Sequence, residues 1–162
     1  MTDQEFKKLF DEHFDAIRNY IYYRSGDADL ATDIVQDVFL RLWEKQLIYQ
    51  KKENKGLLYK MANDEFISRY RRKQLEIKYT KSLAFSLNGV SPEEELQYKE
   101  LQQMYEKALS NLSEKQRVVF LMSRMDGLKY HEIAERLGIS IKAVEKRMKN
   151  TLAFFKFNLL TK

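Results

Sequence analysis

The sequence contains no cysteine, one proline and only five glycines among its 162 residues. The absence of cysteine excludes a disulfide framework and any thiolate metal site, and it is typical of a reducing compartment. Few glycines and a single proline favour helices joined by short connections. No stretch approaches the roughly 20 apolar residues that a membrane span needs, and the first ten residues lack the apolar run of a signal peptide. We therefore expect a soluble, cytoplasmic protein.

The net charge of +5 is unevenly distributed along the chain. Residues 1–50 carry six basic and ten acidic residues, whereas 69–81 carry six basic residues and one acidic residue. Residues 98–162 carry thirteen basic and seven acidic residues. Basic segments of this kind favour polyanionic partners such as nucleic acids. Solvated helix faces would give the same counts, so charge alone leaves both interpretations open.

Apolar residues recur at three- and four-residue steps along most of the chain, and no alternating strand pattern occurs. The pattern predicts an all-α fold, and the length allows either one ordinary domain or two small ones. The best candidate for a flexible linker is 79–95, which contains Gly89 and Pro92 and would divide the chain into domains 1–78 and 96–162. The expected helices cover about 3–24, 28–46, 57–77, 93–110, 113–126, 130–137 and 140–160, with a polar loop at about 50–56. Ser113 with Gln116 forms a capping-box pattern, and Gly127 and Gly138 mark helix ends.

The stretch "YHEIAERLGISIKAVEKRMKN", residues 130–150, has the pattern of two short helices around a glycine turn. Its apolar set is Ile133, Ala134, Leu137, Ile139, Val144 and Met148. Gly138 permits a sharp turn, Ser140 can cap the second helix, and the small Ala134 allows the helices to cross closely. This layout is typical of a helix-turn-helix, whose second helix enters the DNA major groove. A simple αα-corner inside a bundle is the alternative.

The second helix of this unit is predicted to present polar and basic residues outward. They are Ser140, Lys142, Glu145, Lys146 and Lys149, with Arg147 beside them. Lysine and arginine can reach phosphates or guanine edges, and a glutamate can accept from a cytosine amino group. The pattern by itself indicates only DNA binding.

The helix expected over 28–46 separates into an apolar and an acidic face, but Leu40 falls in the centre of the acidic face and Trp43 at its border. The acidic face includes Asp33, Gln36 and Asp37. An apolar centre with an acidic rim favours contact with a basic surface of a protein partner, although a single exposed leucine on a solvated face is also ordinary.

Two stretches together resemble a known family. "DLATDIVQDVFLRLWEK" resembles the core-binding helix of bacterial sigma factors, and residues 91–150, "SPEEELQYKE…" to "…EKRMKN", resemble their C-terminal promoter-binding region. With these two regions alone, the chain is similar to the extracytoplasmic-function group of the sigma-70 family. The resemblance covers roughly residues 6–158 and implies a factor that binds core RNA polymerase and directs promoter-specific transcription initiation.

The resemblance implies three binding surfaces. The first, Asp33, Gln36, Asp37, Leu40 and Trp43, would dock on the β′ clamp helices of polymerase, whose β flap is a further contact of the family. The second would read the −35 element as duplex: Ser140, Lys142, Glu145, Lys146, Arg147, Lys149 and Arg117. The third would hold the melted −10 strand: Tyr59, Asn63, Asp64, Ser68, Arg69, Arg71 and Arg72. An anti-sigma factor, which can hold such a protein at the membrane, is the remaining expected partner.

The expected −10 helix departs from the family pattern. Relatives usually carry an Arg-Asn pair followed by an Asp, as in "ARNLAID", whereas this chain has Asn63, Asp64 and Ser68 at those three places. Tyr59, Asn63, Phe66 and Tyr70 form one stripe of the helix, and aromatic rings there could stack unpaired bases for about 1–3 kcal/mol each. The same aromatic residues could instead form the core of a three-helix domain.

Two alternatives to a sigma factor remain at this stage. One is a dimeric helix-turn-helix regulator that acts without joining polymerase, and the other is a helical adaptor without a nucleic-acid role. The linker suits two promoter contacts, since about 17 residues at 3.3–3.6 Å each reach close to 60 Å, or roughly 17 base pairs. We expect no enzymatic activity, cofactor or metal, because His13 and His131 are far apart in the sequence and no nucleophile–base or phosphate-loop pattern occurs.

Overall fold

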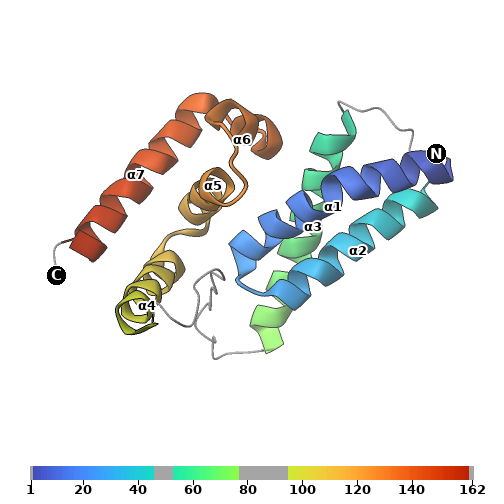
Figure 1. The fold of residues 1–162 in the computed structure, drawn as a ribbon. Helices are drawn as coiled ribbons and strands as arrows, with labels where there is room; N and C mark the ends of the chain where they lie inside the picture. Colours follow the sequence, from blue (N-terminus) through green and yellow to red (C-terminus); the bar gives the residue numbers. More distant parts are fainter. Residues whose placement is uncertain (1, 46–52, 77–94, 161–162) are drawn as a thin grey trace.

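The computed structural model describes residues 2–45, 53–76 and 95–160, with side chains in 2–45, 56–70 and 99–158. This part of the chain is made of helices without strands, so the predicted all-α fold class is confirmed (Figure 1). The helices are α1 (Asp3–Ser25), α2 (Ala28–Glu44), α3 (Glu53–Glu76), α4 (Glu95–Asn111), α5 (Glu114–Arg124), α6 (Tyr130–Leu137) and α7 (Ile141–Leu160). None of the helices described here combines the length and the apolar character that a membrane crossing requires.

The first three helices pack together as one group. Helix α1 begins with a full capping box between Thr2 and Glu5 and ends at Gly26, after which Asp27 caps α2 by accepting the main-chain N–H of Leu30 at 3.0 Å. The two helices therefore turn back on each other within a few residues. Their shared core is apolar and buried: Ile17, Ile21, Ile34, Val35, Val38, Phe39, Leu42, Leu58, Ala62 and Phe66.

The last four helices form a second group, in which α5 and α4 pack on α7 and α6 packs on both α7 and α5. Ser113 caps α5 by accepting the N–H of Gln116 at 3.3 Å, as its sequence pattern predicts. Aromatic rings close this core, with the ring centroids of Phe120 and Phe155 4.7 Å apart. Thr151, fully buried in α7, donates its hydroxyl hydrogen to the carbonyl of Arg147 at 2.7 Å, which satisfies its polar group.

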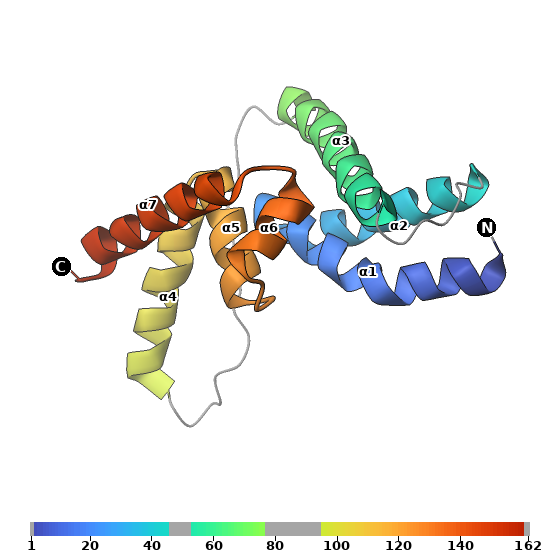
Figure 2. The ribbon, with the colours of Figure 1, turned by 90° about the horizontal axis from the view of Figure 1, so that it is seen from above.

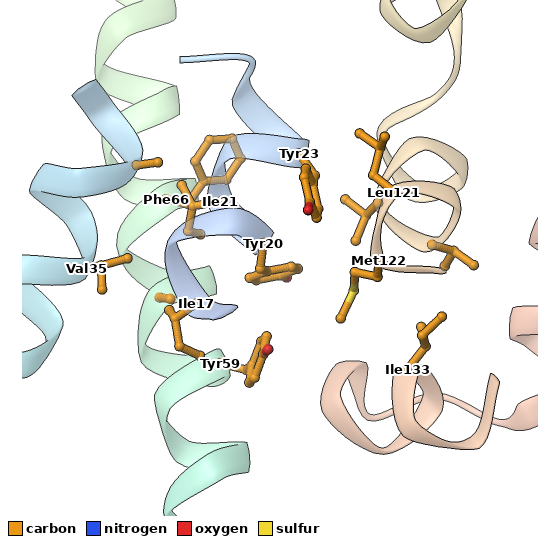
Figure 3. Packing of buried hydrophobic residues seen from close by; sticks show 14 of the residues in the cluster. Ile17, Tyr20, Ile21, Tyr23, Val35, Tyr59, Phe66, Leu121, Met122 and Ile133 are labelled. Carbon is orange, nitrogen blue, oxygen red and sulfur yellow. The ribbon is translucent and has the colours of Figure 1, made fainter. Parts of the chain in front are cut away.

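The two groups lie against each other rather than apart. Helix α1 packs on α5 and α3 packs on α6, whereas the start of α1 and the end of α7 lie at opposite ends of the molecule (Figures 1 and 2). Figure 3 shows the tyrosines of α1 and α3, Tyr20, Tyr23 and Tyr59, facing Met122 of α5 and Ile133 of α6. The buried residues of both groups thus form one continuous hydrophobic cluster.

The helix boundaries follow the predicted pattern closely, with one exception. Residues 53–56 were expected to belong to a polar loop, but they are the first turn of α3. Glycine inside a helix costs only about 1 kcal/mol relative to alanine, so Gly56 does not prevent this extension when the rest of the helix is packed. The predicted linker, 79–95, lies outside the described residues except for Glu95, the first residue of α4.

Candidate nucleic-acid interface

Helices α6 and α7 form the helix-turn-helix that the sequence predicts. Gly138 has φ of 66°, and its N–H and that of Ile139 both donate to the carbonyl of Ala134, which closes the turn. A positive φ is accessible to glycine at little cost, whereas other residues are strained there. The predicted apolar set packs inward: Ile133, Ala134, Val144 and Met148 are buried, and Leu137 and Ile139 are partly buried against them.

The outer face of α7 is open to solvent along its first three turns. Ser140 caps the helix by accepting the N–H of Ala143 at 3.0 Å. Lys142, Glu145, Lys146 and Lys149 are all exposed, as their spacing predicts, and Arg147 is half-buried. The exposed set carries three positive charges and one negative charge over about two turns, which suits the phosphates and base edges of a DNA major groove.

Arg117, which was also predicted to contact the −35 element, does not lie on this face of α7. Its side chain is 2% exposed, in α5, and it points toward the end of α1 rather than toward the face of α7. The guanidinium donates to the carbonyl oxygens of Tyr23 and Arg24 at 2.6 Å each and to that of Leu112 at 3.3 Å. Burial lowers the pKa of this guanidinium from its ordinary value. In this arrangement Arg117 is therefore inaccessible to DNA.

The residues predicted to hold the melted strand follow α3, but the structure exposes them unequally. Tyr59 is 4% exposed, and its hydroxyl accepts a hydrogen bond from Arg136 of α6 at 3.3 Å. Burial raises the pKa of Tyr59 to about 12. Phe66 is buried in the three-helix core, so the core interpretation is confirmed for this residue, whereas Tyr70 is 42% exposed and its ring stacks on Phe66 with a centroid distance of 5.5 Å.

The polar residues predicted to hold the melted strand also differ in their exposure to solvent. Asn63 is half-buried, and its side-chain oxygen accepts a hydrogen bond from Arg24 of α1. Asp64 is exposed and Ser68 is half-buried. Arg69 is also half-buried, since it contacts both Asp37 of α2 and Glu65, the latter at 2.8 Å. Arg71 and Arg72 lie in α3, beyond the part of the helix whose side chains are described.

The acidic face of α2 is largely exposed to solvent. Leu40 is 53% exposed, and Asp33 and Gln36 are exposed on the same side, as the helical pattern predicts. Trp43 is half-buried because its ring packs against Phe6 of α1, with centroids 5.1 Å apart. An apolar side chain in an acidic surrounding is therefore available to a partner, whereas Trp43 offers only part of its ring.

The sequence did not indicate a set of polar residues that joins the two helical groups. Asp126, just after α5, accepts from the Tyr23 hydroxyl at 2.7 Å and from the Asn19 amide at 3.2 Å. Burial raises the pKa of Asp126, against these hydrogen bonds and the charge of Arg136, which lower it. Arg24, near the end of α1, forms an ion pair with Glu114, the first residue of α5. These partners are about a hundred residues apart in the sequence, and none carries a motif.

A pocket of about 310 Å³ lies where α3 meets the end of α6. Tyr59, Lys60 and Asn63 form one wall, and Glu135 and Arg136 form the other. The pocket thus has residues of the expected −10 set on one side and the helix-turn-helix on the other. Among the side chains described, no cluster of three or more histidine, aspartate or glutamate residues is arranged to hold a metal ion.

Two family models match the chain. Residues 9–76, which include most of α1 and all of α2 and α3, match sigma-70 region 2. Residues 102–154, which include all of α5 and α6 and most of α4 and α7, match sigma-70 region 4. The two matches together cover most of the described helices.

Relatives and solved structures agree with these matches. The chain is 34% identical to the ferric citrate uptake sigma factor FecI of Escherichia coli, over 87% of this chain and 83% of that protein. It is 25% identical to the RNA polymerase sigma factor YlaC of Bacillus subtilis, over 93% of this chain and 90% of that protein. A solved structure of the sigma factor RpoE with the anti-sigma factor NepR, from Bartonella quintana, superposes with a TM-score of 0.65 at 25% identity, and it covers 98% of this chain and 99% of that one.

Proposed function

This chain belongs to the extracytoplasmic-function group of the sigma-70 family, and on that premise we propose which of its surfaces contact polymerase and which contact the promoter. As a sigma factor it binds core RNA polymerase and promoter DNA and directs promoter-specific transcription initiation. The presence of both region 2 and region 4 favours this function over a dimeric regulator that acts without polymerase.

In our proposal, the C-terminal domain, residues 96–162, reads the −35 element as duplex. The observation that carries this assignment is the helix-turn-helix of α6 and α7, with its apolar side buried and Lys142, Lys146 and Lys149 exposed. Glu145 lies between these lysines and is the residue best suited to accept from a cytosine amino group. Ser140 and Arg147 flank the same face, whereas Arg117 is buried against α1 and is not part of it.

The N-terminal domain, residues 1–78, binds polymerase through α2 and captures the melted −10 strand along α3. Exposed Leu40 with Asp33 and Gln36 supports a contact with the β′ clamp helices. Tyr70, whose ring is 42% exposed, is the aromatic residue of α3 most accessible for stacking on an unpaired base. Residues 79–95 would link the domains, and the β flap would contact the C-terminal domain.

We further propose that the factor works in the cytoplasm, without catalytic activity of its own, and that an anti-sigma factor controls it. The superposed RpoE structure is a complex with the anti-sigma factor NepR, which supports this partner. Such an inhibitor would need to cover the DNA-binding faces or the acidic face of α2. Tethering by a membrane-bound inhibitor belongs to the same proposal.

Transcription in vitro with core polymerase on a promoter library tests the assignment. The factor should give discrete, promoter-directed transcripts that core polymerase alone does not give. A variant with Lys142→Glu, Lys146→Glu and Lys149→Glu should reduce them at least about tenfold, since each lost base or phosphate contact costs about 1–3 kcal/mol. The matched control, Lys99→Glu, Lys107→Glu and Lys115→Glu, makes the same charge change at exposed lysines of α4 and α5, outside α7. An equal loss in both triple variants would contradict the −35 assignment.

A further inference from the structure

The pocket of about 310 Å³ between α3 and the end of α6 has the dimensions of a small-molecule site. Its volume lies at the lower end of the range that such sites occupy, about 300–1,000 Å³. Tyr20 and Tyr59 both line the pocket, and their rings meet edge to face with centroids 5.2 Å apart (Figure 3). The two tyrosines and Leu137 give the pocket an apolar side that could hold the uncharged part of a ligand.

Asn63, on the α3 wall, can offer the pocket only a hydrogen-bond donor. Its side-chain oxygen accepts from the guanidinium of Arg24, and an arginine has no acceptor, so the amide nitrogen cannot take that place. Arg24 is itself held in position, because its guanidinium lies 4.4 Å from the ring centroid of Phe66 and donates to the Tyr20 hydroxyl at 3.1 Å. None of the described residues accepts a hydrogen bond from the Asn63 amide nitrogen. The orientation of this amide is therefore fixed, and its nitrogen remains available to a ligand.

Arg136, on the α6 wall, has a donor that is not satisfied by the protein. Its Nη1 donates to the hydroxyl of Tyr59 at 3.3 Å, whereas its Nε is buried and has no hydrogen-bond acceptor within the part of the chain that the structure describes. Buried donors in proteins are almost always hydrogen-bonded. A buried guanidinium nitrogen without a protein acceptor, on a residue that lines a pocket, therefore indicates an acceptor that the chain itself does not supply.

The charged side chains of the pocket favour an anion as that acceptor. Lys60 and Arg136 carry positive charge, and Glu135 is the single carboxylate among the lining residues. A phosphate monoester has three strong acceptor oxygens, enough for the Nε of Arg136, the amide nitrogen of Asn63 and the ammonium group of Lys60. A carboxylate has only two oxygens. The number of donors therefore suits a phosphate better than a carboxylate.

We propose that this pocket binds a small phosphorylated molecule of about the size of a nucleoside monophosphate. Its phosphate lies against Arg136, Asn63 and Lys60, and its uncharged part lies along Tyr20 and Tyr59. This site goes beyond the proposed function, because the recognition of a promoter by a sigma factor requires no small ligand. A ligand that binds only the folded chain also raises its apparent stability, by an amount that grows with the ratio of free ligand concentration to Kd.

Calorimetric titration of the free, full-length protein is the first test, with inorganic phosphate and adenosine 5′-monophosphate as probes. We expect saturable binding of the nucleotide at one site, weaker binding of phosphate at the same site, and a rise of the unfolding midpoint with either probe. Adenosine, which lacks the phosphate, should produce neither effect. If neither phosphate nor the nucleotide binds at millimolar concentrations, or if adenosine binds as tightly as the nucleotide, the proposal is wrong.

A nucleic-acid backbone is the other source of phosphate groups, and a dinucleoside phosphate distinguishes it from a small molecule. Adenylyl adenosine carries its phosphate as an internal diester, with two free oxygens instead of three and a smaller charge. It should bind at least about tenfold more weakly than adenosine 5′-monophosphate, since one charge-assisted hydrogen bond is lost. Equal affinities of the two compounds would assign the pocket to a nucleic-acid backbone and overturn the small-molecule site.

The substitution Asn63→Asp tests the donor role of this side chain without removing its contact with α1. One carboxylate oxygen can still accept from Arg24, but the other places negative charge where the amide donor was. The affinity for adenosine 5′-monophosphate should fall at least about tenfold, while the urea midpoint without ligand stays close to the parent value or rises. Asn111→Asp, at an exposed residue of α4, makes the same change away from the pocket and should leave the affinity unchanged. Equal affinities of the two variants would contradict the site.

The two cations provide an independent check. Arg136→Gln should weaken binding of the nucleotide at least about tenfold. Because Arg136 also bonds Tyr59, the second variant is Lys60→Gln, at an exposed side chain whose loss should not disturb folding, and it should weaken binding at least about threefold. Lys107→Gln, in α4, is the control. If Arg136→Gln and Lys60→Gln both bind as tightly as the control, the site is wrong. None of these measurements uses polymerase or promoter DNA, so the site and the proposed function can fail separately.

Discussion

The guanidinium of Arg69, in α3, contacts the carboxylate of Asp37, in α2. This ion pair joins the helix expected to bind the melted strand to the helix expected to bind polymerase. Glu65 completes the arrangement, because it accepts from Arg69 at 2.8 Å and pairs with Arg41 at 2.9 Å. The Glu65 side chain is only 11% exposed, whereas that of Asp37 is 43% exposed. Glu65 is therefore the centre of the network, and Asp37 is its outer member.

Replacement of Glu65 by glutamine should lower the free energy of unfolding by about 1–3 kcal/mol, because two guanidinium groups lose a partly buried anionic acceptor. The urea midpoint, compared at constant slope, measures this loss. Asp64→Asn is the matched control, since Asp64 is the exposed neighbour and its substitution should change stability by no more than about 0.5 kcal/mol. Equal midpoints for the two variants would show that the network contributes nothing.

The core of the helix-turn-helix should be far more sensitive than its surface. Ile133 is fully buried, so Ile133→Ala removes buried methyl groups and leaves a cavity, at a cost of about 2–5 kcal/mol. Ile141, at the start of α7, is 48% exposed, and Ile141→Ala should cost less than about 0.5 kcal/mol. Thermal or urea unfolding compares the two variants directly. A small effect at Ile133 would mean that the two helices do not pack as described.

The acidic face of α2 should govern association with core polymerase. Leu40→Arg with Asp33→Lys places positive charge on this face without disturbing Asp37, which contacts Arg69. We expect co-purification with core polymerase to fall at least about tenfold, since a charge reversal opposes a basic partner surface at its centre. Leu101→Arg with Glu100→Lys, at exposed sites of α4, is the control. Unfolding midpoints of both variants should stay close to the parent value, and undiminished co-purification of the first would contradict the assignment.

The tyrosines at the contact between the two groups should lose their phenolic protons at a higher pH than free tyrosine does. Burial raises the pKa of Tyr59 to about 12, and burial with the hydrogen bond to Asp126 raises that of Tyr23 further. The unfolded chain loses these protons near pH 10, so stability that is fully present below pH 10 is lost as the pH rises toward 12, by about 3 kcal/mol for Tyr59. Tyrosinate absorbance during an alkaline titration measures the effect.

The protein with Glu114→Lys and Asp126→Lys provides the comparison for this titration. If the two groups separate in that variant, Tyr23 and Tyr59 gain solvent, and their titration should move back toward pH 10. An identical alkaline titration in both proteins would show that the two charge reversals leave Tyr23 and Tyr59 covered. The measurement therefore reports on packing without any label.

The sequence predicts well those features that depend on neighbouring residues. Burial of Ile133, Val144 and Met148 and exposure of Leu40 follow from helical spacing, because one face of each helix must be apolar to pack. The positive φ at Gly138 follows from residue type. The extension of α3 back to Glu53 was missed, since the local signals there are weak and packing elsewhere in the helix decides.

The contact between the two groups could not be predicted in this way. Arg117 was expected at a DNA surface, but in the structure it bonds the main-chain carbonyls of Tyr23 and Arg24, and a carbonyl carries no residue-specific signal. In the sequence, Asp126 and Glu114 likewise resemble ordinary acidic residues at helix ends. Their contacts with α1 are visible only in the three-dimensional structure. Tyr59 could be assigned either to the core or to strand binding from its spacing, and only the three-dimensional arrangement shows it covered by Arg136.

The capping of α1 by Arg117 also sets an order for folding during synthesis. The ribosome delivers α1 first, and the donor for its final carbonyls follows 93 residues after Arg24. Until α5 has emerged, the last turn of α1 is hydrated, and the first three helices can assemble with their nucleic-acid face open. The proposed nucleic-acid face of the first three helices is thus exposed in the nascent chain. It becomes covered when the final helices complete the fold.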